Sequence, residues 1–208
     1  MIYPHKIGSI EQIPKEIREL YLVDEEKYRI HDPIIQQAVK DAIGDETNLY
    51  WKMRKIHKYI REHLNYELAG GWNVAPQVLE RGTGSCSEYT FVFISMCRAA
   101  GIPARYVGSA VLRGDDASYD DVFHRWSQVY LPPYGWVHID PQGGDKTSPS
   151  EIADFMGKVA NRYLITTIGG GASEYLEWNY NYNQKWTGLG PVKIYSEAVA
   201  EWSPIYEK

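Results

Sequence analysis

The 208-residue sequence has few cysteines, no long apolar run and no block of like charge. Its two cysteines, Cys86 and Cys97, fall on one predicted helix, which separates them by about 16 Å along the helix axis. A disulfide needs Cα atoms within about 7 Å of each other, so we expect two free thiols. A chain of this length can bury a hydrophobic core without a disulfide or a metal.

Membrane and nucleic-acid functions find little support in the composition. No stretch approaches the roughly 20 apolar residues of a membrane-spanning helix, and the first residues lack an apolar core of signal-peptide length. The net charge of −5 argues against a broad nucleic-acid surface. We expect an exported or periplasmic location if a signal has been removed, and a cytoplasmic one otherwise; the oligomeric state stays open.

Metal-binding patterns are also missing. The six histidines include no H-E-x-x-H motif, and no group of cysteines and histidines has zinc spacing. Four aspartates between residues 113 and 121 could suggest calcium, but they lack EF-hand spacing and fit a solvated acidic loop better. These are Asp115, Asp116, Asp120 and Asp121. We therefore expect neither a metal nor a cofactor.

The first third of the chain has helical periodicity. Residues 11–22 and 32–43 are predicted helices, the second with Asp32 as its N-cap and a proline at its first position. Residues 47–64 carry apolar side chains at spacings of three and four, which indicates one buried stripe. A short helix is predicted at 76–81.

The periodicity changes after a central helix that begins at Ser85. Residues 91–100 of this helix are apolar on nearly every side, so we expect it to be buried. Residues 104–113, 122–131 and 136–140 have the composition of strands. Two more strands are predicted, one near residues 163–168 and one through the aromatic segment 174–183.

Cys86 occupies the first turn of the central helix. Ser85 and Glu88 have the S-x-x-E order of a capping box, which places Cys86 at the first helical position. An ordinary thiol has a pKa near 8.5, and the positive end of a helix lowers it toward the physiological range. The position therefore favours a nucleophile, whereas Cys97 is expected to be a small buried hydrophobe.

Four motifs in a fixed order carry a family resemblance. A G-x-C sequence starts the central helix, R-x-x-G-I-P-A-R-x-V leads into a strand, H-x-W lies on the next strand and W-x-x-x-D-P on the one after. This order resembles the catalytic core of the transglutaminase-like superfamily, a branch of the papain-like cysteine enzymes. The resemblance covers about residues 76–142. It implies that Cys86 is the nucleophile, His124 the base and Asp140 the orienting carboxylate.

The predicted hairpin sets a geometric condition on this triad. Side chains alternate across a strand, so His124 and Asp140 share a face only if the loop between the strands holds an odd number of residues. We expect such a loop, with the central helix packed against that face and its N-terminus at the hairpin. His138, although near the site, is expected to be a surface residue of the hairpin.

Four further residues are weaker candidates for the site. A cysteine enzyme needs hydrogen-bond donors for the developing oxyanion, and members of the family often use an upstream tryptophan or glutamine, which here would be Trp72 or Gln77. Trp126 of the H-x-W motif is a candidate for substrate contact. Gln128 stands where many members carry glutamate, which leaves the triad intact but changes the local hydrogen bonding.

The expected fold is α+β, a papain-like or transglutaminase-core fold. N-terminal helices and the central buried helix that carries Cys86 pack on an antiparallel β-sheet. We expect one domain over residues 1–208, with a helical part at about 1–75, a catalytic core at about 76–145 and an extension at about 146–208 that completes the sheet.

The expected function is that of a thiol enzyme that acts on amide bonds through an acyl-thioester. Hydrolysis by a cysteine peptidase or amidase is favoured, because the chain lacks room for the β-sandwich domains of the animal cross-linking enzymes; this is an analogy at the level of the fold. The alternatives are a protein-glutamine transglutaminase, a peptide:N-glycanase-like deglycosylase and a non-enzymatic peptide- or glycan-binding accessory domain. The expected partner is a peptide or protein substrate, glycosylated in some of these alternatives.

Overall fold

The computed structural model describes residues 2–68, 71–112, 118–119 and 123–183, and beyond these 185–188, 190, 193, 195, 201–203 and 205. Its helices are α1 (Lys15–Tyr21), α2 (Pro33–Ile43), α3 (Leu49–His63), α4 (Ala75–Arg81), α5 (Cys86–Ala99) and α6 (Pro149–Asp154). Its strands are β1 (Asn65–Tyr66), β2 (Thr83–Gly84), β3 (Ala104–Val111), β4 (Ser118–Tyr119), β5 (Phe123–Leu131), β6 (Gly135–Ile139), β7 (Tyr163–Ile168) and β8 (Glu201–Trp202).

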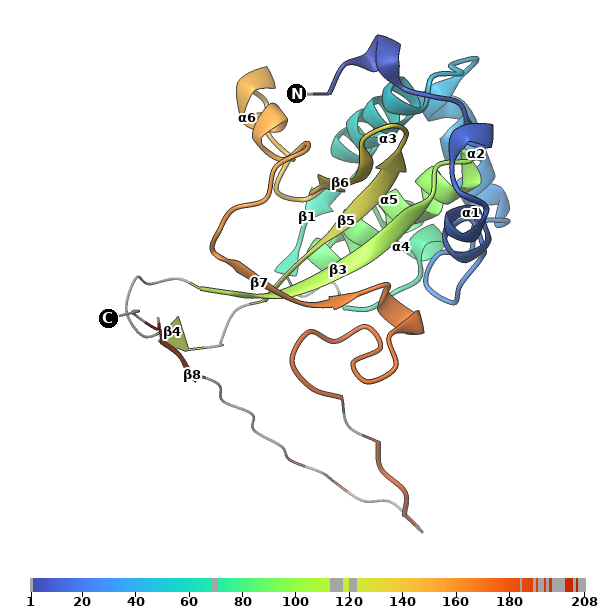
Figure 1. Ribbon diagram of the computed structural model, residues 1–208. Helices are drawn as coiled ribbons and strands as arrows, with labels where there is room; N and C mark the ends of the chain where they lie inside the picture. The colour runs from blue at the N-terminus through green and yellow to red at the C-terminus, as the bar shows by residue number, and fades with distance from the viewer. Residues whose placement is uncertain are drawn as a thin grey trace.

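Four antiparallel strands form the central sheet, in the order β6-β5-β3-β7 (Figure 1). The strand predicted near 163–168 is β7, which pairs with β3 and adds the last strand of the sheet. Two smaller pairs lie outside this sheet: β1 runs parallel to β2, and β4 runs antiparallel to β8.

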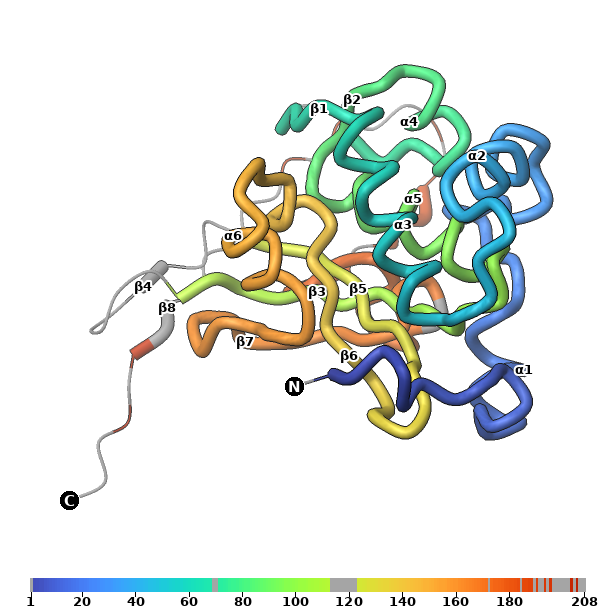
Figure 2. Tube along the Cα trace, turned by 90° about the horizontal axis from the view of Figure 1, so that it is seen from above, coloured from blue at the N-terminus to red at the C-terminus, as the bar shows by residue number. Residues whose placement is uncertain are grey.

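Helix α5 lies between the sheet and the other large helices. It contacts β3 and β5 on one side and α2, α3 and α4 on the other, and these helices gather over one face of the sheet (Figure 2). Every residue of α5 except Ala99 is buried. The α+β class and the central buried helix predicted from the sequence are therefore confirmed.

Polar caps begin the predicted helices close to the expected positions. The Asp32 carboxylate accepts the backbone N–H of Ile34 at the start of α2, and the Asn48 side chain does the same for Tyr50 at the start of α3. The helix predicted at 11–22 is shorter than expected. It begins only after Pro14, whose ring removes a backbone donor and separates α1 from a single 3₁₀ turn at Ile10–Gln12.

The strand predicted through residues 174–183 is wrong. This segment is a series of turns that folds the indole of Trp178 onto the core. The indole contacts the rings of Tyr28, Phe91 and Tyr106 at 5.6, 5.3 and 5.4 Å between centroids. Gly170 permits this approach, since a Cβ there would lie 2.3 Å from the indole. Packing of one large ring overrides the strand-like composition.

No helix in the described part of the chain combines the length and the apolar character that crossing a bilayer requires.

Candidate active site

The β5–β6 hairpin brings His124 and Asp140 together. Leu131 pairs with Gly135, so the loop holds three residues, an odd number as the alternation of side chains requires. The Nε2 atom of His124 lies 2.5 Å from Oδ2 of Asp140. Both side chains are nearly buried, at 12% and 10% exposure, so little water competes for this contact.

The chain that follows β6 fixes the Asp140 carboxylate from behind. Its Oδ1 atom accepts the backbone N–H of Gly143 at 2.8 Å, and the backbone N–H of Asp140 donates to the carbonyl of Phe155 at 3.0 Å. A side chain at position 143 would not fit, because its Cβ would lie 2.5 Å from the same carboxylate. The turn therefore helps to hold the Asp140 carboxylate toward His124.

Cys86 lies near His124 and Asp140 at the part of β5 that extends beyond its pairing with β6. The pairing of β6 with β5 ends at Ser127, so no strand among the described residues pairs with the backbone of Arg125 on that side. The start of α5 lies beside this part of β5. The Thr90 hydroxyl is 2.7 Å from the carbonyl of Cys86 and 3.2 Å from that of Arg125. The His124 imidazole and the backbone N–H of Arg125 face the Cys86 thiol and both lower its pKa.

The expectation that α5 packs against the face of the hairpin that carries His124 is wrong. Helix α5 covers the opposite face, where the ring of Phe91 contacts that of Tyr106 and where Val129 and Ile139 join the core. The apolar side chains of β5 and β6 dictate this choice, because they alternate with the polar ones. Only the N-terminus of the helix meets His124.

The electrostatics of the site favour a charged Cys86–His124 pair. Burial raises the pKa of Cys86, but the hydrogen bond and charge of His124, together with the charge and backbone N–H of Arg125, outweigh it and lower that pKa. Burial lowers the pKa of His124, but the charge and hydrogen bond of Asp140 outweigh it and raise that pKa. A thiolate beside an imidazolium is the form that both shifts favour.

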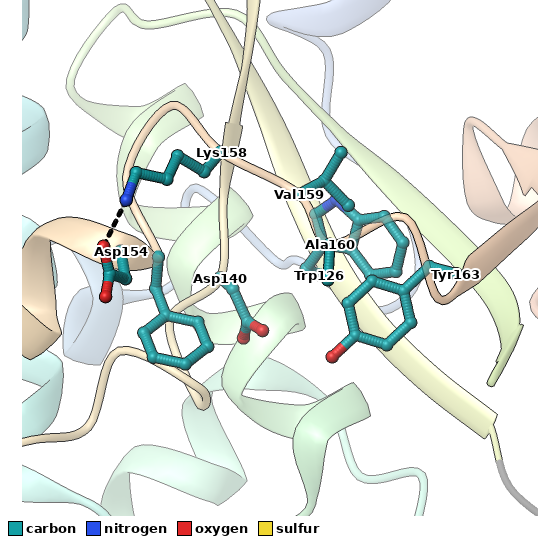
Figure 3. A pocket seen from close by; sticks show the side chains of 8 residues that line it. Trp126, Asp140, Asp154, Lys158, Val159, Ala160 and Tyr163 are labelled. Carbon is teal, nitrogen blue, oxygen red and sulfur yellow. Dashed lines mark hydrogen bonds and ion pairs between the residues drawn. The ribbon is translucent and has the colours of Figure 1, made fainter. Parts of the chain in front are cut away.

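A cavity of about 280 Å³ opens beside Asp140 on the face of the hairpin opposite α5. The Asp140 carboxylate and the Tyr163 hydroxyl point toward the same region, with Trp126 on the wall (Figure 3). An ion pair between Lys158 and Asp154 borders it. The cavity therefore combines aromatic walls with the carboxylate that contacts His124.

Trp126 and Gln128 share a network with His138. Trp126 is 1% exposed, and its indole N–H donates to Nδ1 of His138 at 2.8 Å. Gln128 accepts from Nε of Arg105 at 2.7 Å and places its amide nitrogen 3.0 Å from Nε2 of His138. The expectation of a surface histidine is therefore wrong: His138 is half-buried, because both of its ring nitrogens meet polar groups of β5.

The two upstream candidates lie in different surroundings. Trp72 is 39% exposed, and the Arg125 guanidinium lies 4.6 Å from the centre of one of its rings, on the Cys86 side of the molecule. Gln77 is exposed on α4. The segment of Trp72 is anchored by Glu88, which accepts the backbone N–H of the next residue, Asn73, at 3.1 Å and that of Ser85 at 3.0 Å.

Sequence reasoning missed Arg125 and Tyr163. Arg125 stands between the histidine and the tryptophan of H-x-W, at a position that the motif leaves open. Tyr163 arrives from β7, and its ring lies 5.4 Å from that of His124. Neither residue carries a local signal; only the periodicity of β5 and β7 could have indicated the faces on which they lie.

The described residues include no group of three or more histidine, cysteine or acidic side chains arranged to hold a metal ion. The four aspartates considered for calcium lie outside the described residues.

Comparison with known proteins decides the family. Residues 36–141, more than half of the chain, match the transglutaminase-like superfamily. The chain belongs to that superfamily. The match ends just after Asp140 and contains all four motifs on which the resemblance rests.

Relatives of this transglutaminase-like chain are distant and longer. An uncharacterized protein of Haemophilus influenzae is 29% identical over 165 residues, which are 64% of this chain and 44% of that protein. Kyphoscoliosis peptidase of Mus musculus is 21% identical over 221 residues, 99% of this chain and 32% of the mouse protein. The chain thus spans less than half the length of either relative.

Two solved structures share the fold. A Cytophaga hutchinsonii protein named as a candidate cysteine protease superposes with a TM-score of 0.58 and 18% identity, over 79% of this chain and 50% of that one. The periplasmic domain of TgpA from Pseudomonas aeruginosa, bound to ethylmercury, gives 0.52 and 20% over 68% of this chain and 53% of that one.

Proposed function

We propose that this transglutaminase-like chain is a thiol enzyme that cleaves amide bonds through an acyl-thioester, as a cysteine peptidase or amidase. The observation that carries the proposal is the contact between Nε2 of His124 and the buried carboxylate of Asp140, together with the effect of His124 on the Cys86 thiol. The lowered pKa of Cys86 and the raised pKa of His124 support it, because a nucleophile and its proton donor need these shifts.

In the proposed reaction the Cys86 thiolate attacks the carbonyl carbon of the amide. The His124 imidazolium gives its proton to the leaving amine as the C–N bond breaks, and the acyl group stays on sulfur as a thioester. The neutral imidazole then takes a proton from water, whose oxygen attacks the thioester and frees the acid. Asp140 holds the imidazole in orientation through both steps.

The oxyanion of each tetrahedral intermediate needs hydrogen-bond donors. We propose the backbone N–H of Cys86 as one donor and an upstream side chain, Trp72 or Gln77, as the second. The proximity of the Trp72 ring to Arg125, whose backbone N–H contacts the thiol, favours Trp72. Trp126 and Gln128 lie on the same face of the hairpin as His124, and the ring of Trp126 lies 5.8 Å from that of His124. We propose that these two residues support the substrate side of the site from that face.

The acceptor of the acyl group decides the name of the enzyme. The mouse relative is called a peptidase and the Cytophaga protein a candidate cysteine protease, which favours water as the acceptor and a peptide or protein as the substrate. An amine acceptor would make the chain a transglutaminase, and a glycosylated asparagine substrate would make it a deglycosylase. A purely binding role would not require the contacts among the three residues.

Mass spectrometry of reaction products tests the proposal. A pool of denatured and glycosylated proteins is incubated with the chain in ¹⁸O-water, with and without methylamine. Hydrolysis places ¹⁸O in a new carboxyl group, whereas transamidation attaches methylamine to glutamine side chains. Cys86→Ala is the inactive variant and Cys97→Ala the matched thiol control. Absence of any product that depends on Cys86 would reject the enzyme proposal in favour of a binding role.

A further inference from the structure

Arg125 carries a buried charge with no carboxylate partner among the residues that the structure describes. The residue is only 2% exposed, and its Nε and Nη1 atoms have no hydrogen-bond acceptor. The other buried arginine of the core, Arg98, is paired with Glu25 at 2.7 Å. Buried cations are ordinarily paired, because an unpaired one loses its hydration without compensation.

Aromatic rings hold the guanidinium in place. Its central carbon lies 4.1 Å from the ring centre of Phe123, 4.6 Å from that of Trp72 and 5.4 Å from that of Tyr180. The faces of aromatic rings attract cations, but each contact contributes only about 0.5–2 kcal/mol. These rings therefore fix the position of the charge without neutralising it.

The position of this charge is set by the strand that carries His124. Consecutive side chains of β5 point to opposite faces, so His124 and Arg125 lie on either side of the strand edge that the Cys86 thiol contacts. A thiolate, an imidazolium and the Asp140 carboxylate together carry one negative charge. The Arg125 guanidinium brings the total charge of the group to zero. An anionic substrate group bound to Arg125 would make that total negative again.

We propose that Arg125 is a positioning residue: its guanidinium is a fixed positive charge that holds Cys86 and His124 as a thiolate–imidazolium pair. This inference rests on the proposed function, since it assigns Arg125 to the same thiol. The unpaired N–H groups are then a cost in stability that the fold carries beside the nucleophile. An apolar side chain of similar shape in its place would not carry the desolvation cost of an unpaired buried charge.

The other titratable groups that face Cys86 are tyrosines. Tyr66 of β1, Tyr106 of β3 and Tyr163 of β7 all interact with the thiol, and burial raises the pKa of each hydroxyl. These hydroxyls remain neutral between pH 5 and 9. Among the described residues, His124 and Arg125 are the cationic groups that act on the thiol across this range.

The pH profile of alkylation tests the proposal. The rate of Cys86 labelling by iodoacetamide is measured from pH 4 to 9 in the wild type and in Arg125→Met, Arg125→Lys and Arg105→Met. Arg105 is the matched control, because its guanidinium also lies over a ring, that of Trp136 at 3.9 Å, but on a different part of the sheet. Melting temperatures are recorded for all four proteins.

We expect Arg125→Met to raise the inflection of the profile by roughly 1–3 pH units, which lowers the labelling rate at pH 6 by about tenfold or more. Its melting temperature should stay level or rise. Arg125→Lys keeps the charge and should keep most of the low inflection, and Arg105→Met should not move it.

An unchanged inflection in folded Arg125→Met overturns the proposal. A marked fall in its melting temperature also overturns the proposal, because Arg125 would then be a structural residue. An unchanged profile together with a selective loss of activity on acidic peptides overturns it as well, because Arg125 would then bind an anionic group of the substrate. Alkylation of Cys86 does not require catalysis, so the experiments can reject the proposed enzyme activity and the proposed role of Arg125 independently. A low wild-type inflection without amide cleavage rejects only the enzyme, and an ordinary inflection with cleavage rejects only the role of Arg125.

Discussion

The two cysteines of α5 share one helix and nearly the same burial but differ in their surroundings. Cys86 is 3% exposed and Cys97 0%. Burial alone acts on Cys97 and raises the pKa of its thiol, whereas at Cys86 the charges and hydrogen bonds of the β5 edge reverse that effect. Burial therefore does not decide whether a thiol of this helix can react; the groups that face it do.

The same contrast holds for two buried histidines that meet opposite sides of Asp140. His124 faces the carboxylate, which raises its pKa. His57 of α3 is 1% exposed, and burial together with the charges of Arg61 and Arg54 lowers its pKa to about 4, although it also faces the backbone of Asp140. One aspartate thus keeps the first histidine charged, and the second remains neutral behind it.

The largest effect should come from exchanging the two thiols for alanine in turn. Cys86→Ala should lower turnover by about 10⁴-fold or more, as should His124→Ala, and the double variant should be no worse than either, because residues that act as a unit are not additive. Cys97→Ala should keep the rate and lose about 1–2 kcal/mol of unfolding free energy to a small cavity. Steady-state kinetics and denaturant unfolding measure both.

Two outcomes would break this contrast. Near-native activity in His124→Ala would remove the proposed base from the mechanism, and a loss of turnover in folded Cys97→Ala would show that the site reaches further into α5 than its first turn.

Alkylation at pH 6 compares the thiols directly. We expect iodoacetamide to label Cys86 on the order of 10³-fold faster than Cys97, because the thiolate is the reacting form and Cys97 is both protonated and enclosed. Peptide mapping by mass spectrometry reads out the two adducts. Equal labelling, or labelling of Cys97 first, would contradict the assignment of Cys86 as the reactive thiol of α5.

Much of this contrast could be predicted from the sequence, because it depends on local patterns. The S-x-x-E order at Ser85 fixes where α5 begins, and the apolar residues that follow fix its burial. The position of Cys86 in the first turn and that of Cys97 in the middle follow from these two facts. An odd number of residues in the β5–β6 loop likewise places His124 and Asp140 on the same face of the hairpin.

The remainder depends on contacts between distant segments. No local pattern indicates that Arg125 would have no carboxylate partner among the described residues, or that His138 would meet Trp126 and Gln128 across the hairpin. The aromatic segment 174–183 has the composition of a strand, but Trp178 finds its partners on β3 and α5, and those contacts decide its course. The proposed roles of Trp72 and Gln77 likewise depend on a substrate.

The two histidines should give the stability of the protein opposite pH dependences. Unfolded His57 binds a proton near pH 6.5 and the folded residue only near pH 4, so the unfolded state gains about 3 kcal/mol as the pH falls through this interval. His124 has a raised folded pKa, so its contribution is complete below pH 6.5 and is lost only as the pH rises. The acid side thus reports on His57.

Unfolding of the wild type and of His57→Gln between pH 4 and 7 isolates this effect from that of the carboxylates. The free-energy difference between the two proteins should shrink as the pH falls. A difference that stays constant would mean that folded His57 takes up its proton at the same pH as the unfolded residue, contrary to its burial.

The smallest effect should come from a third histidine, His138, whose neighbours are mismatched. A neutral imidazole offers one donor and one acceptor. Its Nδ1 accepts from Trp126, so its Nε2 carries a proton, yet the group opposite is the amide nitrogen of Gln128, whose oxygen accepts from Arg105. Turning the amide over only moves the mismatch to Arg105, which has no acceptor to offer.

Gln128→Glu supplies an oxygen to each neighbour, one for the Arg105 guanidinium and one for Nε2–H of His138. We expect this variant to gain about 1 kcal/mol of unfolding free energy at pH 7, the net value of one hydrogen bond satisfied in place of a clash. The same change in an Arg105→Met background should lose the gain, because a buried carboxylate without its cation is costly. Denaturant unfolding of the four proteins forms a double-mutant cycle. A loss of stability in Gln128→Glu alone would mean that desolvation of the new carboxylate outweighs the repaired hydrogen bond. In that case burial would be the larger effect in the network around His138, whereas at Cys86 and His124 neighbouring charges outweigh it.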